Sequence, residues 1–304
     1  MSIKPRHESE AARPPLLTPK GALLLIFIAI VFQAVVQGSM TSWISPADSM
    51  LFTALAFAFT TVIFSIVARI PEAQRTTVRL DIRTMVVMNI ATAVTFLAFY
   101  ASISMIPAAT TSALESAFGP VAVAVLGFAF GRSRTSRSRW LVALALVVLG
   151  AALVGVTWDS GSAGALTVPG VLLAALAGWG MAAVTLLSHA LGQAQVSPVV
   201  VTAHRFHASY LVAGLIWLFG GPELPQAGFV LTLLGLGLLA TSIPLFLLQI
   251  GLQRAQPFAA MLVVTSLPAL TFVVQVMSGM HAELTSLGLI VAIIVVSALG
   301  VLRK

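Results

Sequence analysis

The chain has 304 residues, of which 59% are hydrophobic and only 8% are charged, and its mean hydropathy is +1.05. Soluble domains carry about 25% charged residues, so this composition argues against a cytosolic enzyme, a secreted module and a nucleic-acid binder. The net charge of +7 is spread over short clusters between apolar segments, as membrane topology requires. Cysteine is absent, which leaves no disulfide framework, thiolate nucleophile or zinc–thiolate site.

Ten apolar segments are long enough to cross a hydrocarbon layer of about 30 Å, which takes roughly 17–25 helical residues. We therefore predict an all-α polytopic membrane protein with ten transmembrane helices. Alternation with a period of two is absent, which argues against a membrane β-barrel. Residues 1–18 are expected to form a disordered tail, and the first apolar segment a retained helix. The predicted helices cover residues 21–38, 47–68, 84–105, 108–131, 140–158, 166–190, 199–219, 227–251, 257–278 and 286–302.

The basic residues predict the orientation of these helices. With ten crossings, 15 of the 16 Lys and Arg residues fall in the tails and loops of one side, and the remaining one, Arg205, lies inside a helix. The only charged residues in the loops of the other side are acidic, so the positive-inside rule places both termini in the cytoplasm. We expect an integral protein of the inner or plasma membrane. The acidic residues of the opposite side are Asp48, Asp159, Glu223 and Glu283.

Similar motifs recur in the two halves of the chain in the same order and at a near-constant offset. Ser45-Pro46 corresponds to Ser197-Pro198, and Pro120 corresponds to Pro268. Each half contains five predicted helices, so the second half would enter the membrane inverted relative to the first. We expect a repeat over residues 19–158 and a second one over residues 166–304.

The second half carries motifs that indicate a family, beginning with Thr241-Ser242-Ile243-Pro244 and continuing through Leu252–Ala255, Leu267–Leu270 and Glu283-Leu284-Thr285. The first half has a comparable stretch over Ala113–Phe118, followed by Gly119-Pro120-Val121, Gly131 and Leu149-Gly150. With these motifs the chain resembles EamA-type proteins of the drug/metabolite transporter superfamily. The resemblance implies two inverted five-helix halves, a central cavity, and export of amino acids or similar small metabolites.

Two segments depart from that family pattern. The first predicted helix has Phe32-Gln33-Ala34-Val35-Val36-Gln37 where a Trp-Gly pair is common, and Gly131-Arg132 stands where Gly-Glu is common. Both departures concern the identity of the substrate.

Charged side chains inside a bilayer are costly and mark functional sites. Glu115 lies about 10 Å into the fourth predicted helix at 1.5 Å per residue, and we consider it as a proton-coupling carboxylate or as an anchor for a substrate ammonium. The other interpretation is a carboxylate that is buried and bonded to neighbouring helices. Arg205 is a candidate contact for a substrate carboxylate, or else it extends along its helix to the cytoplasmic headgroups. His204 and His207 are candidate proton carriers, or else they bond neighbouring helices.

Uncharged polar and aromatic side chains complete the predicted substrate site. An unpaired amide in hydrocarbon costs several kcal/mol, so each polar residue either bonds a neighbouring helix or lines an aqueous path. Matched helix breaks at Gly119, Pro120 and Pro268 would mark the transport site, or else they only shape the helices. The candidate substrate-binding residues are Gln33, Asn89, Tyr100, Glu115, Trp179, Gln249 and Thr265.

These features favour a secondary transporter with alternating access, and not an enzyme. We expect no cofactor, no metal and no nucleic-acid partner; the partners would be a small metabolite and the lipid bilayer, and the protein would be a monomer or a weak homodimer. Three alternatives stay open: a nucleotide-sugar or sugar-phosphate exchanger, a lipid-modifying membrane enzyme, and a channel. Walker, dinucleotide and HExxH motifs are absent from the sequence, which argues against ATP-driven transport by this chain alone.

Overall fold

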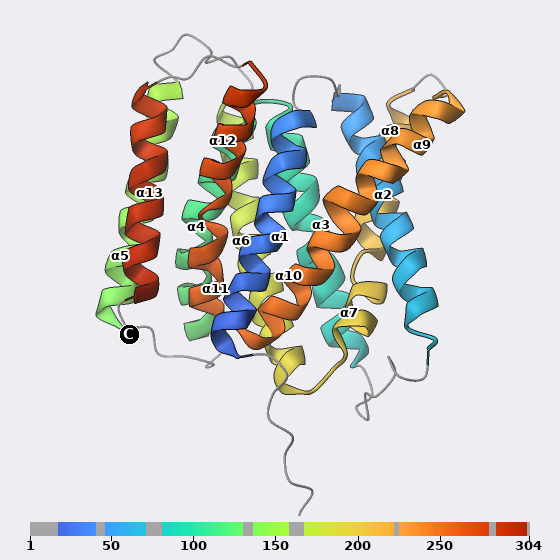
Figure 1. The fold of residues 1–304 in the computed structure, drawn as a ribbon, viewed down its shortest axis with the longest axis horizontal. Helices are drawn as coiled ribbons and strands as arrows, with labels where there is room; N and C mark the ends of the chain where they lie inside the picture. Colours follow the sequence, from blue (N-terminus) through green and yellow to red (C-terminus); the bar gives the residue numbers. More distant parts are fainter. Residues whose placement is uncertain are drawn as a thin grey trace, which may run out of the picture.

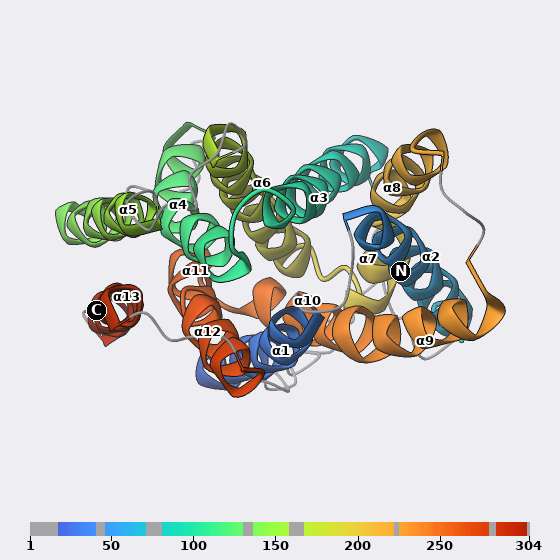
Figure 2. The same cartoon turned by 90° about the horizontal axis from the view of Figure 1, so that it is seen from above.

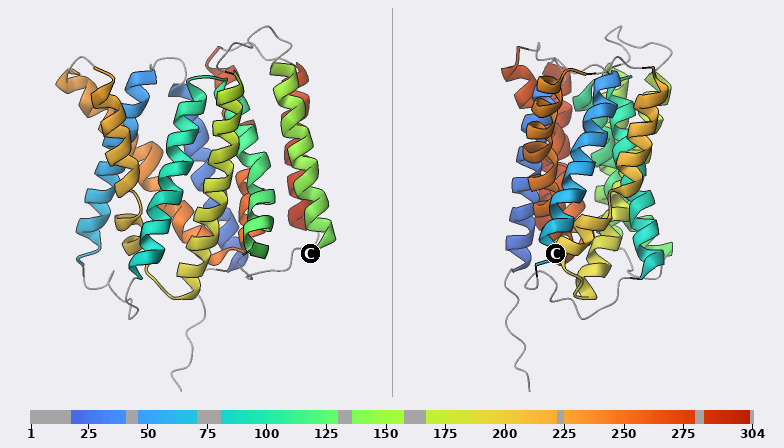
Figure 3. Two further views of the ribbon diagram at one scale, coloured as in Figure 1. Left: turned by 180° about the vertical axis from the view of Figure 1, so that it is seen from behind. Right: turned by 90° about the vertical axis from the view of Figure 1, so that its right-hand side faces the viewer.

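The computed structural model of the chain describes residues 18–40, 46–70, 81–129, 136–157, 167–221, 225–279 and 284–302. Within these ranges all regular secondary structure is helical. The predicted tail over residues 1–18 lies outside the described residues, except for Thr18. The helices run between two edges of the molecule, and the start of α1 and the end of α13 lie at the same edge (Figures 1 and 3).

The first half of the chain forms five helices and the second half forms the remaining, more fragmented ones. The first five are α1 (Pro19–Met40), α2 (Pro46–Val67), α3 (Ile82–Ile103), α4 (Ala108–Ala129) and α5 (Arg137–Thr157). The others are α6 (Thr167–Gln193), α7 (Pro198–His204), α8 (His207–Phe219), α9 (Ala227–Gly237), the π-helix η3 (Leu238–Ser242), α10 (Ile243–Arg254), α11 (Pro257–Val264), α12 (Leu267–Met277) and α13 (Leu284–Leu302).

Local sequence explains where several helices begin. Pro19, Pro46, Pro198 and Pro257 are the first residues of α1, α2, α7 and α11, a position where proline costs no hydrogen bond and its φ is already helical. The carboxylate of Asp81 caps α3 by accepting hydrogen bonds from the hydroxyl and backbone N–H of Thr84. These bonds lower the pKa of Asp81 because they favour its charged form.

Nine helical segments of the described ranges are long and apolar enough to cross a membrane. The pairs α7–α8 and α11–α12 each count as one segment, from Pro198 to Phe219 and from Pro257 to Met277. Large apolar side chains are exposed on the outside of these helices, among them Leu141 and Val148 of α5. Because water does not solvate such a surface, the chain is an integral membrane protein.

The predicted eighth crossing differs from a regular helix. Residues 227–254 form α9, η3 and α10 in direct succession, and none of these pieces reaches the length of a crossing on its own. Pro244 cannot donate to the carbonyl four residues earlier and its ring would collide with that carbonyl. The wider π turn Leu238–Ser242 lies directly before Ile243 and gives the proline ring room that a regular α turn lacks. The hydroxyls of Ser242 and Thr60 in α2 are hydrogen-bonded at 2.7 Å beside this turn.

Only one of the two helix breaks predicted from the matched prolines is present. α4 continues from Ala108 to Ala129 with Pro120 inside it. The prediction of a break at Gly119-Pro120 is therefore wrong. Membrane helices tolerate an internal proline when neighbouring groups take over its hydrogen bond. Pro268 does follow a break, since α11 ends at Val264 and α12 begins at Leu267.

The helices form two facing layers, which Figure 2 shows from above. In one layer α6 packs against α3 and α4, and α5 packs against α4. In the other layer α1 packs against α10, α11 and α12. α5 contacts α13 at one end of the bundle, and α2 contacts α8 and α9 at the other end. Each layer therefore contains helices from both halves of the sequence.

Glycines let α6 approach its neighbours closely. A Cβ at Gly178 would lie 2.5 Å from the backbone oxygen of Glu115 in α4, and a Cβ at Gly180 would lie 2.9 Å from the backbone nitrogen of Thr95 in α3. Neither backbone atom can move without shifting a helix. These two glycines thus fix the distances between α6 and the helices α3 and α4, which carry much of the cavity described below.

We predict that Gly180→Ala destabilises the protein by about 1–3 kcal/mol, the usual cost of overpacking a tight interface. The matched control is Gly235→Ala in α9, where an added Cβ has open space and alanine favours the helix. Thermal unfolding in detergent should show a lower midpoint for the first variant only. Equal midpoints for both variants would contradict the close approach of α6 to α3.

Candidate functional site

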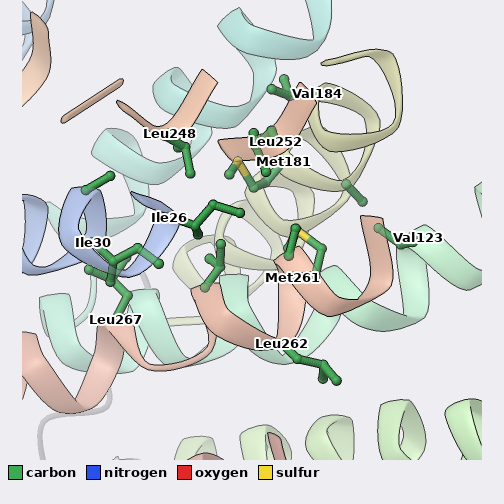
Figure 4. Packing of buried hydrophobic residues seen from close by; sticks show 14 of the residues in the cluster. Ile26, Ile30, Val123, Met181, Val184, Leu248, Leu252, Met261, Leu262 and Leu267 are labelled. Atoms are coloured by element: carbon green, nitrogen blue, oxygen red, sulfur yellow. The ribbon is translucent and has the colours of Figure 1, made fainter. Parts of the chain in front are cut away.

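A cavity lies between the two layers and is bordered by seven helices. Its volume is about 30 Å³, well below the roughly 300–1,000 Å³ of small-molecule pockets, so the helices hold the cavity in a contracted form. Part of the apolar cluster shown in Figure 4 borders the cavity, since Ile30, Met181, Leu248 and Leu267 belong both to that cluster and to the lining. The lining residues are Ile30, Gln33, Gln37, Thr95, Phe96, Phe99, Glu115, Met181, Leu248, Val264 and Leu267.

Glu115 is the only ionisable residue of this lining. It lies in α4, its side chain is 7% exposed, and within the described part of the chain its carboxylate makes no hydrogen bond or ion pair. A buried carboxylate usually has such partners, and leaving it without them is costly. The carboxylate is therefore available to a proton or to a cationic group that enters the cavity.

Two amides of α1 border the same space. Gln33 and Gln37 are four residues apart, so they share one face of the helix, and both line the cavity. The side-chain oxygen of Gln37 is buried without a hydrogen-bond partner among the described residues. Gln33 was among the predicted substrate contacts, and the structure brings it to the same cavity as Glu115.

An aromatic group forms one side of the cavity. Phe96 and Phe99 of α3 belong to the lining. Behind them, the ring of Phe57 in α2 lies 4.8 Å from the ring of Phe96 and 4.9 Å from that of Phe206, measured between centroids. These rings separate the cavity from the region where α7 meets α8.

Arg205 lies in that region, at the break between α7 and α8. Its side chain is 1% exposed, so it does not extend to the lipid headgroups as one interpretation of the sequence supposed. The guanidinium Nη1 donates to the Oε1 of Gln249 in α10, and the Ser188 hydroxyl of α6 donates to the same oxygen at 3.2 Å. The carbon of the guanidinium lies 4.6 Å from the centre of the Phe206 ring. Arg205 and Gln249 are therefore together, but neither belongs to the cavity lining.

Asn89 has a structural role at the same break. Its Nδ2 donates to the backbone oxygen of His204 at 2.7 Å, and its Oδ1 accepts from the backbone N–H of Ala208 at 3.2 Å. A single amide thus serves the last turn of α7 and the first turn of α8, whose backbone groups lack helical partners. The predicted role of Asn89 in binding substrate has no support from this geometry.

Thr265 plays a similar part at the break between α11 and α12. Its hydroxyl bonds to the backbone oxygen of Leu262 at 2.6 Å and to the hydroxyl of Ser297 in α13. Thr265 therefore joins this break to α13. Its neighbours Val264 and Leu267 line the cavity, whereas Thr265 does not.

The other predicted site residues lie outside the cavity lining. Tyr100 packs edge-on against Phe99 with centroids 5.6 Å apart. Trp179 packs against the main apolar cluster. His204 is exposed, and the Nδ1 of His207 bonds to the Tyr210 hydroxyl at 3.1 Å.

The sequence pointed to Glu115 and Gln33 but not to the apolar part of the lining. Phe96, Phe99 and Met181 stand in continuous apolar segments, and hydropathy does not distinguish a side chain that faces a cavity from one that faces lipid. Ser188 was missed because small hydroxyl residues are common in membrane helices. The four-residue spacing of Gln33 and Gln37 is the sequence signal for the polar side of the lining, because it places both amides on one helix face.

Comparison with known proteins identifies a shared fold. No family model matches the chain, and no curated protein matches it. Thirteen chains of solved structures are similar to it. One of them, known from a crystal structure, covers 94% of this chain and 100% of its own length with a TM-score of 0.71 and 19% sequence identity. At this identity the similarity establishes the fold alone.

We predict that Gln37→Cys reacts with a charged, water-soluble thiol reagent at least roughly tenfold faster than Val35→Cys, because only the thiolate reacts and lipid disfavours it. The two positions are neighbours in α1, but Gln37 lines the cavity and Val35 is half exposed on the outside. Each introduced thiol would be the only one, since the chain has no cysteine. Equal rates would show that the cavity is closed to water.

Proposed function

We propose that the chain is a secondary transporter that moves a small metabolite with an amino group, an amino acid in the first instance, through the central cavity by alternating access. The observation that carries this proposal is Glu115, a buried carboxylate to which the described residues offer no hydrogen bond or ion pair, in a lining that contains no other charge. An ammonium group of the substrate would supply the missing partner. The aromatic and aliphatic lining around it would accept an apolar side chain.

The charge of the lining favours this class over polyanionic substrates. Nucleotide sugars and sugar phosphates carry several negative charges and need Lys or Arg in their site. The lining contains one acidic and no basic residue, so a phosphate in this cavity would face a carboxylate without a compensating cation. The exchanger alternative is therefore disfavoured by Coulomb repulsion in a site of low dielectric constant.

The packing of the helices supports two inverted halves with ten crossings. In such a repeat α1 is equivalent to α6, α3 to the segment α9–η3–α10, and α5 to α13. The contact of α3 with α6 is then equivalent to the contact of α10 with α1, and both are present. α5 also contacts its own equivalent, α13. Contacts that are related in pairs in this way are expected of two inverted repeats with a pseudo-two-fold axis. We accordingly include residues 227–254 as a tenth crossing and propose an EamA-like carrier of the cell membrane with both termini in the cytoplasm.

We assign any proton coupling to Glu115 and not to the histidines. His204 is exposed and His207 is bonded to Tyr210, and both lie outside the lining. A proton and a substrate ammonium would compete for the same carboxylate, which couples their movements without a second site. Transport would then involve no covalent chemistry and no cofactor.

We expect Glu115→Gln to slow the export of labelled leucine from liposomes roughly 10–100-fold, since a hydrogen bond to a charged group contributes about 1.5–3 kcal/mol. Glu115→Asp should retain part of the rate. With the wild-type protein an opposing pH gradient should change the rate, and this response should disappear in Glu115→Gln.

Asp81→Asn serves as the matched control, because Asp81 is an exposed acidic residue at the start of α3. It should transport leucine like the wild-type protein. A fully active Glu115→Gln variant with an intact response to pH would contradict the proposed role of the carboxylate. If the wild-type protein moves no amino acid, amino-acid export itself is wrong.

A further inference from the structure

A second polar cluster is buried outside the cavity lining, and the proposed transport cycle leaves it unexplained. It consists of Arg205 at the α7–α8 break, Gln249 in α10 and Ser188 in α6, and we call it the arginine cluster. The three side chains are 0–1% exposed. They come from three separate elements, so the cluster exists only in the folded protein.

Hydrogen bonding within the arginine cluster leaves donors without acceptors. The Oε1 of Gln249 accepts from both Arg205 and Ser188. The Nε of Arg205 and the Nε2 of Gln249 are buried donors without a partner in the described part of the chain. Buried donors are rarely left unpaired in native proteins. The cluster therefore has more donors than acceptors, and what it lacks is an acceptor.

The charge of the cluster is also uncompensated. Arginine keeps its proton in proteins, and within the described residues no acidic side chain contacts its guanidinium. The ring of Phe206, 4.6 Å from the guanidinium carbon, attracts the charge but accepts no strong hydrogen bond from Nε. A buried charge without a counter-ion is strongly unfavourable, so the protein gains if an anion occupies this place.

We infer that the arginine cluster binds a carboxylate. A carboxylate offers two acceptor oxygens in one plane, which suits the donors of a guanidinium, and its single negative charge matches the single positive charge of Arg205. A phosphate dianion would leave a net negative charge in a buried place. The Nε of Arg205 and the Nε2 of Gln249 are the donors that the carboxylate would engage.

The arginine cluster lies behind the aromatic wall of the central cavity. Leu248, the residue before Gln249, belongs to the cavity lining. Phe206 follows Arg205 and stacks on Phe57, whose ring contacts that of Phe96 in the lining. The carboxylate can thus come from two sources, a free carboxylate or the carboxylate end of a transported amino acid. The second source rests on the proposed function, whereas the first does not.

The first test measures thermal unfolding in detergent with increasing acetate, at constant ionic strength set with chloride. Acetate should raise the midpoint of the wild-type protein in a saturable manner by about 3 °C or more. Arg205→Gln should remove this response. Gln249→Glu supplies an internal carboxylate beside Arg205, so it should raise the midpoint without acetate and also remove the response.

Gln253→Glu is the matched control, since it places the same charge one turn further along α10 at another buried glutamine. It should lower the midpoint and leave the response to acetate intact. If Gln249→Glu is destabilised as much as Gln253→Glu, or still responds to acetate like the wild-type protein, the carboxylate site is wrong. This result does not depend on whether Arg205→Gln folds.

A second arm distinguishes the two sources by comparing leucine with leucinamide, which lacks the carboxylate. If the substrate supplies the carboxylate, leucine should stabilise the wild-type protein more than leucinamide does, and the difference should vanish in Gln249→Glu. If a free carboxylate is the ligand, acetate should add to the effect of leucine as much as it adds to that of leucinamide. Absence of leucine transport combined with an intact, Arg205-dependent acetate response would refute the proposed substrate but retain this site. No Arg205-dependent response to acetate or leucine would refute the site itself.

Discussion

A helix that is interrupted inside a membrane must find other partners for its freed backbone groups, because the surrounding lipid offers none. This constraint explains much of the polar composition of the bundle. Asn89 serves both sides of the α7–α8 break, and Thr265 links the α11–α12 break to α13. Ser242 and Thr60 bond to each other beside the π turn that precedes α10. Polar residues that satisfy a break are occupied and are not available to a ligand.

Two other groups of buried polar residues carry opposite charges. Glu115, with Gln33 and Gln37, gives the cavity one carboxylate and uncommitted amide groups. The arginine cluster has buried donors that lack acceptors. Both places are expensive to maintain in a low-dielectric interior, which is a physical reason to assign ligands to them. A molecule with an ammonium and a carboxylate group carries the complement of both.

The sequence predicted the helices well because hydropathy reports directly on contact with lipid. The ends of α1, α2 and α6 lie within a few residues of the predicted ones. The breaks were harder to predict, since Pro120 is accommodated inside α4 while the break at Arg205-Phe206 contains no proline. Glu115 could be singled out from its charge and depth. The structural role of Asn89 could not, because it depends on a partner more than a hundred residues away in the chain.

The central claim is that the chain crosses the membrane ten times as two inverted halves, with residues 227–254 as a crossing in spite of the π turn. The most direct test introduces a single cysteine, Ser2→Cys or Lys304→Cys, and treats intact cells with an impermeant thiol reagent. We predict that both are protected in intact cells and labelled once the membrane is opened, since an even number of crossings returns the chain to the side where it began. Labelling of one terminus and protection of the other in intact cells would mean an odd number of crossings and would contradict the inverted repeat.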